Sequence, residues 1–360
     1  MKPILYLGDD DASRAAAYLC GVLTWAGIPF ERVSSGVSPA VDFDPTRYSA
    51  MIVSDYASEF WRAGQMEQVL QAVHRGMGFA MFGGWESFHG LKSTGEYNRT
   101  PLSQLLPVLI LDSDDRRNFA QPCLVVRTVD PQTKRPVEHE MLAGLPWETN
   151  PPGIGGVCLF TPKPGTRTLL DAVPLRVSVH PELWECSDVS NSRSSPDEMA
   201  TAMGGRSERC PTDASELERI STWKRPTTGW RFDLCDPIPL LVTGSYGLGR
   251  TVAFASDVAP HWVGGMVDWG TPRRVTQTLC AGAFAELSTD GFIEVGADYA
   301  TFFRQLTQWL AAEPFDMKPE PSDMEPEPSD MEPEPSDMEP EPFDVEPSDE
   351  NDYGRRFRSR

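Results

Sequence analysis

The stretch "FGGWESFHG" at residues 82–90 gathers several side chains that could do chemistry into one tight segment. It follows a short apolar run at 78–81 and contains glycines, a tryptophan, a serine and a histidine. In many α/β proteins a strand-to-turn-to-helix corner of this kind presents a nucleophile above the sheet. The first question is therefore whether this corner carries one.

The position at which such a corner would carry its nucleophile is occupied by Trp85. A nucleophile elbow needs Cys or Ser on the sharp turn, where a helix N-terminus stabilises the developing anion. Trp85 lies two residues after Gly83, and its indole offers no useful nucleophilic atom. Ser87 lies two residues further on, outside the G-x-S-x-G spacing. The simplest interpretation is a tight glycine turn whose nearby Ser87 and His89 could still line a pocket.

A second candidate lies in "SDVAPHW" at 256–262, directly after a strand-like run. Asp257 and His261, four residues apart, could ligate a metal or form an acid/base pair. The plainer alternative is that Asp257 caps a turn and Trp262 packs. We expect any pocket to be lined by Gly84, Trp85, Ser87, His89, Asp257 and His261. No catalytic role is assigned to any of these residues, and no metal or other cofactor is expected.

The first 110 residues alternate between strand-like and helix-like patterns, which predicts a parallel sheet built from βαβ units. Apolar runs predict strands at 4–8, 30–35, 50–55 and 78–84. Helical spacing of apolar residues predicts helices over about 15–26 and 66–76. Ligands of open parallel sheets bind beyond the carboxyl ends of the strands. The segments 8–11, 54–61 and 83–90 should emerge there.

Three consecutive acids, Asp9, Asp10 and Asp11, follow the first predicted strand. An acidic loop repels a phosphate group, so this loop does not serve as the phosphate-binding loop of a dinucleotide-binding fingerprint. The loop could take a divalent cation, but we expect solvated acids.

From about 120 to 260 the pattern changes to strands and turns. The run "PLLVTGSYGLGRTVAFASD" predicts a hairpin that turns at 245–249. The polar stretch 187–229 has little periodicity and is expected to be a flexible insertion. A closing amphipathic helix is predicted over 299–310. Its buried side should consist of Tyr299, Phe302, Phe303, Leu306 and Leu310.

Charge and composition exclude several classes of function. The net charge of the 360 residues is −21, but 17 of the acids, with one lysine, lie in residues 313–352. The rest of the chain is mildly acidic and has no basic stripe, so nucleic-acid binding is not expected. No window approaches the ~18 apolar residues of a membrane span. Because the start lacks the pattern of a signal peptide, a cytoplasmic location is expected.

The seven cysteines are scattered without a CxxC pair. This spacing argues against both a disulfide framework and a zinc knuckle. Most of the cysteines should be small core residues or inert thiols.

Four stretches carry a resemblance to a known family. They are "FGGWESFHG", "MLAGLPWE" (141–148), "GSYGLGRTVAFASDVAPHW" (244–262) and "FFRQLTQWL" (302–310). In this order they resemble the putative glutamine amidotransferase-like family, which is related to class I glutamine amidotransferases. The resemblance covers roughly residues 2–312 apart from 187–229, and it implies a flavodoxin-like α/β sandwich. Working class I enzymes use a Cys at the elbow together with a His and a Glu. The Cys position matches Trp85.

The expected architecture is therefore one amidotransferase-like domain over 1–312, with β-rich additions, and an acidic repeat tail over 313–360. The expected function is that of an amidotransferase-like protein without glutaminase activity, which binds a small polar ligand or a protein partner. One alternative is a hydrolase that uses Asp257 and His261 with Ser87 or a metal. Another is a structural or assembly module, and a homo-oligomer is compatible with the sequence.

The tail should be dispensable for folding. Ten of the 33 prolines lie between 314 and 347, alternating with acids, and each heptapeptide repeat offers one Met as its apolar group. Such a segment cannot offset the ~1–2 kcal/mol per residue that ordering a backbone costs. Truncation after Ala312 is expected to leave the melting temperature almost unchanged. A fall of several degrees, or protection of tail amides from hydrogen exchange, would show that the tail docks on the rest of the chain.

Overall fold

Short apolar runs build the parallel half of a central sheet. The computed structural model describes residues 2–10, 15–91, 94–179, 230–276 and 292–312. The parallel strands are ordered β2 (Phe30–Val33), β1 (Ile4–Gly8), β3 (Ala50–Ser54), β4 (Gly78–Phe82) and β12 (Gly249–Phe254). Every residue of β1, β3 and β4 is buried, as in a parallel sheet covered on both faces. The predicted parallel sheet is confirmed.

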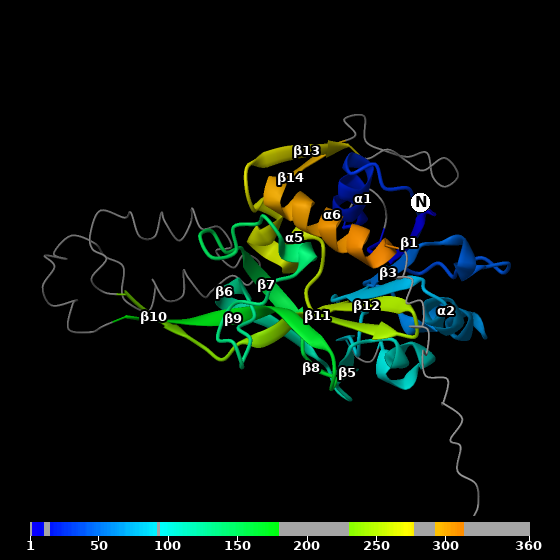
Figure 1. The fold of residues 1–360 in the computed structure, drawn as a ribbon, viewed down its shortest axis with the longest axis horizontal. Helices are drawn as coiled ribbons and strands as arrows, with labels where there is room; N and C mark the ends of the chain where they lie inside the picture. The colour runs from blue at the N-terminus through cyan, green and yellow to red at the C-terminus, as the bar shows by residue number, and fades with distance from the viewer. Residues whose placement is uncertain (1, 11–14, 92–93, 180–229, 277–291, 313–360) are drawn as a thin grey trace, which may run out of the picture. The chain divides into compact units, whose positions relative to one another are not determined.

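An antiparallel half continues the same sheet beyond β12 (Figure 1). The predicted hairpin joins β11 (Ile238–Tyr246) to β12. The further strands are β9 (Arg167–Val179), β6 (Arg116–Arg127) and β7 (Gly153–Cys158), with β10 (Trp230–Leu234) paired to β9. The β-rich additions and the parallel strands thus form one mixed sheet of ten strands among the described residues.

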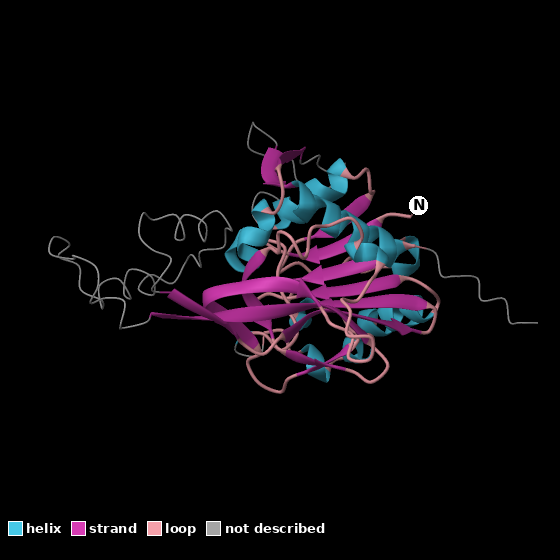
Figure 2. Cartoon of the chain, turned by 60° about the vertical axis from the view of Figure 1, so that its left-hand side comes forward, coloured by secondary structure: helices cyan, strands magenta, loops and turns pink. Residues whose placement is uncertain are grey.

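Helices cover both faces of the sheet. Helices α1 (Ala16–Trp25) and α6 (Ala297–Ala311) pack together on one face, and α2 (Gln65–His74) lies on the other (Figures 1 and 2). The connection that contains α1 runs from β1 to β2, whereas the connection that contains α2 runs from β3 to β4 in the opposite direction along the sheet. Right-handed crossovers in opposite directions place their helices on opposite faces.

The remaining elements are short. Two small sheets pair β5 (Val108–Ile110) with β8 (Phe160–Pro162), and β13 (Pro272–Thr276) with β14 (Phe292–Gly296). A single helical turn, α5 (Pro260–Val263), follows the end of β12. Single turns of 3-10 helix lie at Pro45–Arg47, Ser58–Phe60, Tyr97–Arg99, Pro101–Gln104, Glu140–Leu142 and Gly264–Asp268.

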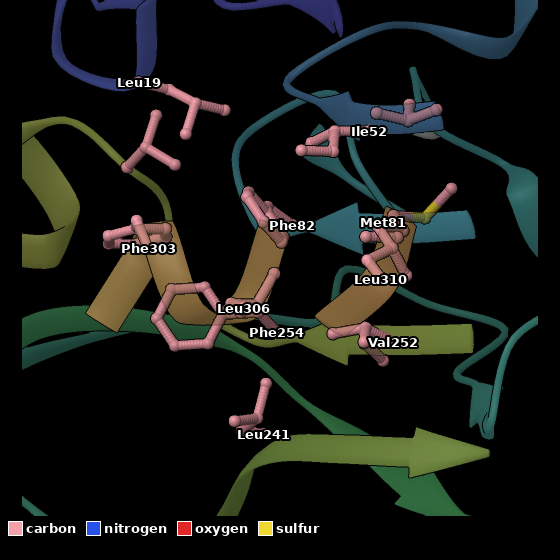
Figure 3. Close-up of a cluster of buried hydrophobic side chains, with 14 of the residues drawn as sticks. Leu19, Ile52, Met81, Phe82, Leu241, Val252, Phe254, Phe303, Leu306 and Leu310 are labelled. Atoms are coloured by element: carbon pink, nitrogen blue, oxygen red, sulfur yellow. The ribbon is translucent and has the colours of Figure 1, made fainter. Parts of the chain in front are cut away.

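The closing helix packs on the junction of β4 and β12. The five residues predicted for its buried side are all at most 1% exposed. Phe303 of α6 lies against Phe82 and Phe254, with ring centroids 5.9 and 5.8 Å apart, and the two strand residues are 5.7 Å from each other (Figure 3). The helix is longer than predicted because it begins at Ala297 and ends at Ala311.

All the described residues belong to one compact unit. Two expected segments lie outside the described residues, the insertion at 187–229 and the tail at 313–360. The limits of each segment therefore stay predictions. Within the described part of the chain, no helix is long and apolar enough to cross a membrane.

The packing of α6 can be tested with a matched pair of leucine substitutions. Leu306 is fully buried on α6, whereas Leu248 is 58% exposed in the turn between β11 and β12. Leu306→Ala should lower the free energy of unfolding by about 2–5 kcal/mol, because it removes buried surface and leaves a cavity. Leu248→Ala should change it by about 0.5 kcal/mol or less. Urea denaturation of both variants gives the measurement, and equal losses would contradict the described packing.

Candidate functional site

The parallel strands end in register at one edge of the sheet. Their aligned last residues are Gly8, Ser54, Phe82 and Phe254. The next residues along the chain therefore meet there. They are Asp9, Asp55, the corner that begins at Gly83 and, slightly further on, Asp257. This edge is the one at which the sequence predicted a functional crevice.

The corner after β4 is held to the end of β12. The Gly83 N–H donates to the carbonyl oxygens of both Phe254 (2.8 Å) and Ser256 (2.9 Å). Gly84 has a φ of +151°, and a Cβ there would lie 2.6 Å from Asp55 Oδ1. Residues with a side chain rarely adopt that backbone conformation. The tight turn expected from the glycines is present.

Trp85 stands at the turn with its side chain 47% exposed. The Arg116 guanidinium lies over the indole ring, 5.2 Å from its centroid, and pairs with Asp114 at 2.7 Å. A cation over an indole face is a favourable arrangement. Trp85 is therefore a half-exposed aromatic side chain of the corner, supported by an arginine.

Ser87 is not presented as a nucleophile. Its side chain is fully buried, and its Oγ accepts the backbone N–H of Asp55 at 2.9 Å. The next residue, Phe88, has a φ of +51° and packs against Phe160, with ring centroids 5.3 Å apart. Ser87 thus fastens the corner to the end of β3.

His89 is also buried, at 4% exposure. Its backbone N–H donates to Asp115 Oδ2 at 2.8 Å, and the N–H of Gly90 donates to Asp115 Oδ1 at 3.2 Å. The second half of the corner is therefore held by a carboxylate that immediately precedes β6. Asp115 was not among the candidates chosen from the sequence.

Asp257 and His261 do form a pair. Asp257 is fully buried, and its Oδ2 lies 2.8 Å from His261 Nε2, while the His261 side chain is half exposed. Asp257 Oδ1 accepts the backbone N–H groups of Val258 and Ala259. Trp262 is buried. The sequence left two interpretations of Asp257 open, a cap of the turn or a partner of His261. The structure shows both contacts.

The sequence interpretation missed two members of this site. Asp9 was expected to be a solvated acid, which is wrong, because it is only 2% exposed. Its backbone N–H donates to the Ser54 carbonyl, and the Tyr6 hydroxyl donates to its Oδ2. Positive φ angles of +56° and +51° at Asp9 and Asp10 turn the chain directly after β1. Asp10 is exposed as expected, and Asp11 lies outside the described residues.

Asp55 is the second missed member, and its Oδ1 accepts the Glu86 N–H at 2.6 Å. A usable signal was present in the sequence. The dipeptide Ser-Asp follows a buried strand twice, at Asp55 after β3 and at Asp257 after β12. We call Asp9, Asp55 and Asp257 the carboxylate cluster.

The carboxylate cluster is electrostatically unusual. Burial, and then the neighbouring Asp257, raise the pKa of Asp55 to about 7, although the Glu86 N–H acts in the opposite direction. Burial, Asp257 and Asp55 also raise the pKa of Asp9 well above its ordinary value. The bond to Asp257 raises the pKa of His261. Strongly perturbed carboxyl groups at a strand edge are typical of functional sites.

One cysteine lies beside the corner. The Cys158 thiol is fully buried and donates to the Gly84 carbonyl at 3.5 Å. Burial, and then Asp115, raise the pKa of this thiol well above its ordinary value. Since only the thiolate is a good nucleophile, Cys158 is inert at neutral pH.

Two surface cavities lie elsewhere. One, of about 340 Å³, is lined by Lys2, Ser49 and Gly76 at the opposite ends of the strands and by the end of α6. The other, of about 500 Å³, is lined by residues around the "MLAGLPWE" segment, among them His139 and Glu148. Among the described residues, no group of three or more His, Cys, Asp or Glu side chains has the geometry to hold a metal ion.

The fold and the corner define a class of protein. The parallel strand order β2-β1-β3-β4-β12 is that of flavodoxin-like doubly wound sheets. The corner after β4 consists of bends at 84–89, with no α-helix directly after it.

Residues 52–181 match the model of a family described as "Putative glutamine amidotransferase". The resemblance expected from the sequence is thus confirmed over this stretch, which contains the corner but not Asp257 or His261. No curated protein matches the sequence.

Solved structures with a similar arrangement include a cytoplasmic protein from Salmonella typhimurium LT2. It is 20% identical with a TM-score of 0.48, covering 72% of this chain and 90% of that one. A putative ThuA-like protein from Parabacteroides merdae is 13% identical with a TM-score of 0.42, covering 89% and 94% of the two chains. A glutamine amidotransferase from Methylobacillus flagellatus is 14% identical with a TM-score of 0.29, covering 47% and 61%. At these identities a shared activity does not follow.

The raised pKa of Asp55 predicts a pH dependence of stability. A carboxyl whose pKa is higher in the folded than in the unfolded state stabilises the fold at low pH. That stability is lost as the pH rises from about 4 to about 7, at up to about 1.4 kcal/mol per pH unit. Asp55→Asn keeps the acceptor for the Glu86 N–H and removes the charge. The variant should therefore gain stability relative to the wild type as the pH rises through this window.

Urea denaturation at several pH values measures this difference. Asp42→Asn provides a control, because it removes a carboxylate from an exposed position outside the site. Parallel wild-type and Asp55→Asn profiles would contradict the perturbed environment of Asp55.

Proposed function

We propose that this chain is an amidotransferase-like protein that binds a small polar ligand or a protein partner at the carboxyl edge of its parallel strands and does not hydrolyse glutamine. The observation that carries the proposal is the half-exposed Trp85, held under Arg116, at the position of the nucleophile. An elbow that stabilises a covalent intermediate needs a thiol or hydroxyl at this position.

The backbone of the corner supports the same proposal. In a nucleophile elbow, the N–H of the residue after the nucleophile forms part of the oxyanion hole. The corresponding N–H belongs to Glu86, and it donates to Asp55 Oδ1 at 2.6 Å. A negatively charged intermediate would have to displace a carboxylate to use this donor. The donor that would stabilise such an intermediate is therefore already engaged.

Neither Cys158 nor Ser87 substitutes for the missing nucleophile. Cys158 is buried with a raised pKa, and Ser87 is buried with its Oγ bonded to the Asp55 N–H. Neither atom is placed to attack a substrate that arrives from solvent.

A second candidate function is hydrolysis by a water molecule that His261 activates. Its support is the pair of His261 Nε2 and Asp257 Oδ2 at 2.8 Å, with the imidazole half exposed. A histidine oriented by a buried carboxylate is a common general base. This route does not use Ser87. Loss of a measured hydrolytic activity in His261→Gln, with glutamine still untouched, would favour it.

The proposal predicts the outcome of a glutaminase assay. The purified protein should release no ammonia from glutamine above the rate of a blank. Trp85→Cys should remain inactive as well, because the Glu86 N–H still binds Asp55. Ammonia release by the wild type that disappears after cysteine modification would show that a cysteine outside the corner attacks the substrate, and the proposal would be wrong.

A further inference from the structure

A single turn of 3-10 helix forms part of the wall of the larger surface cavity. The turn spans Glu140–Leu142 and leads into the "MLAGLPWE" segment, to which the proposed function gives no role. The cavity of about 500 Å³ is lined by Leu142, Gly144 and Leu145 of this segment and by His139, which directly precedes the turn. The contacts that hold the turn therefore help to determine the shape of the cavity.

The His139 side chain caps the turn. Its Nδ1 accepts the backbone N–H of Met141 at 3.2 Å, and its backbone is extended, as in other cap residues. A ring nitrogen accepts a hydrogen bond only while it carries no proton. The capping imidazole is therefore neutral, with its proton on Nε2. Protonation would place an N–H of the ring against the N–H of Met141 and abolish the cap.

The surroundings of the ring favour the neutral form. His139 is half-buried, and its ring lies edge-on to Trp309 of α6, with ring centroids 5.2 Å apart. The Arg250 guanidinium lies 5.1 Å from the centroid of the same indole and donates to the Trp309 carbonyl at 2.6 Å. Burial is the main cause that lowers the pKa of His139. Glu140 acts in the opposite direction, and Arg167 and Arg250 lower the pKa further.

The other charged groups that line the cavity are paired or exposed. The Arg127 guanidinium pairs with Glu148. The side chains of Glu138 and Glu140 are exposed, so water and salt weaken their attraction for a protonated ring. Arg167 donates to the Glu138 carbonyl at 3.0 Å, which keeps its positive charge near the cap. A proton on the ring would therefore remove the cap without gaining a buried acidic partner among the described residues.

We propose that His139 makes this wall of the cavity sensitive to pH: its neutral imidazole holds the turn Glu140–Leu142 closed, and its protonation releases the turn. This inference concerns regulation, and it does not depend on the proposed function. A histidine whose pKa is lower in the folded than in the unfolded state contributes stability above about pH 6.5, and this stability is lost as the pH falls through the lowered pKa. The turn should therefore be closed at neutral pH and open increasingly often in mildly acidic solution.

Contacts that do not titrate keep the change local. The Trp147 indole N–H donates to the Leu142 carbonyl at 3.0 Å, and the Gln305 side chain donates to the Ala143 carbonyl at 3.1 Å. Neither donor changes its protonation in this range of pH. The opening should therefore expose the amide of Met141 and change the shape of the cavity while the rest of the segment stays in place.

Hydrogen exchange of the Met141 amide in the full chain tests the inference. After correction for the intrinsic exchange rate, its protection factor should fall about tenfold between about pH 7.5 and about pH 5, because an opening linked to one proton changes by up to about tenfold per pH unit. His139→Asn keeps a side-chain acceptor at the cap and takes up no proton, so its protection factor should stay constant. His139→Ala has no acceptor and should leave Met141 weakly protected at both pH values. The exposed His74 gives a matched control, because His74→Asn should respond like the wild type.

An NMR titration of the unmutated protein gives a second readout that does not require a variant to fold. At neutral pH the His139 ring should carry a proton on Nε2 and none on Nδ1, and it should take up its second proton below about pH 6.5. Equal protection of Met141 at both pH values in the wild type would overturn the inference, and so would a proton on Nδ1 at neutral pH. A fall in protection of the same size in His139→Asn would assign the pH response to another group and overturn it as well.

Discussion

The donation of the Gly83 N–H to the carbonyls of Phe254 and Ser256 holds the end of β12 against the corner after β4. The first four parallel strands form from local patterns, whereas β12 joins them by the alignment of Phe82 with Phe254, and its hairpin partner β11 continues the sheet into the antiparallel half. This register brings the corner and Asp257 to one edge, although they are far apart along the chain. It also places Phe82 and Phe254 side by side under Phe303 of α6. A shift of β12 by one residue would turn its side chains to the other face of the sheet. Phe254 would then leave Phe82 in the core, and Asp257 would leave the corner.

Burial of the carboxylate cluster is the main unfavourable feature at this edge. Desolvation is the leading cause of the raised pKa at both Asp9 and Asp55, and Asp257 raises both further. Such an arrangement persists only where the surrounding structure holds it. Here the holding contacts come from side chains, the Tyr6 hydroxyl on Asp9 and His261 on Asp257, and from the backbone. The Val258 and Ala259 N–H groups bind Asp257, and the Glu86 N–H binds Asp55. Features that cost stability without a packing benefit are the usual marks of a site under functional constraint.

The sequence predicted those parts of the fold that depend on local patterns. The strand runs, the hairpin before Phe254 and the buried face of α6 all follow from periodicity and turn residues, and the glycine corner follows from its composition. Parts that depend on long-range register could not be predicted. Nothing near His89 indicates that Asp115 binds its backbone, and nothing near Asp9 indicates that its side chain is buried. Asp55 could have been predicted from the sequence, because Ser-Asp follows a buried strand there as it does at Asp257.

The corner itself shows how its parts depend on one another. Gly84 could be explained as a requirement of the sharp turn alone, yet its contacts point to a more specific reason. A Cβ at this position would lie 2.6 Å from Asp55 Oδ1, the same oxygen that accepts the Glu86 N–H. The missing side chain of Gly84 is therefore what lets Asp55 reach the backbone of the turn. Ser87 completes the arrangement by accepting the Asp55 N–H. The donors and the glycine of this corner therefore hold a carboxylate at the end of β3.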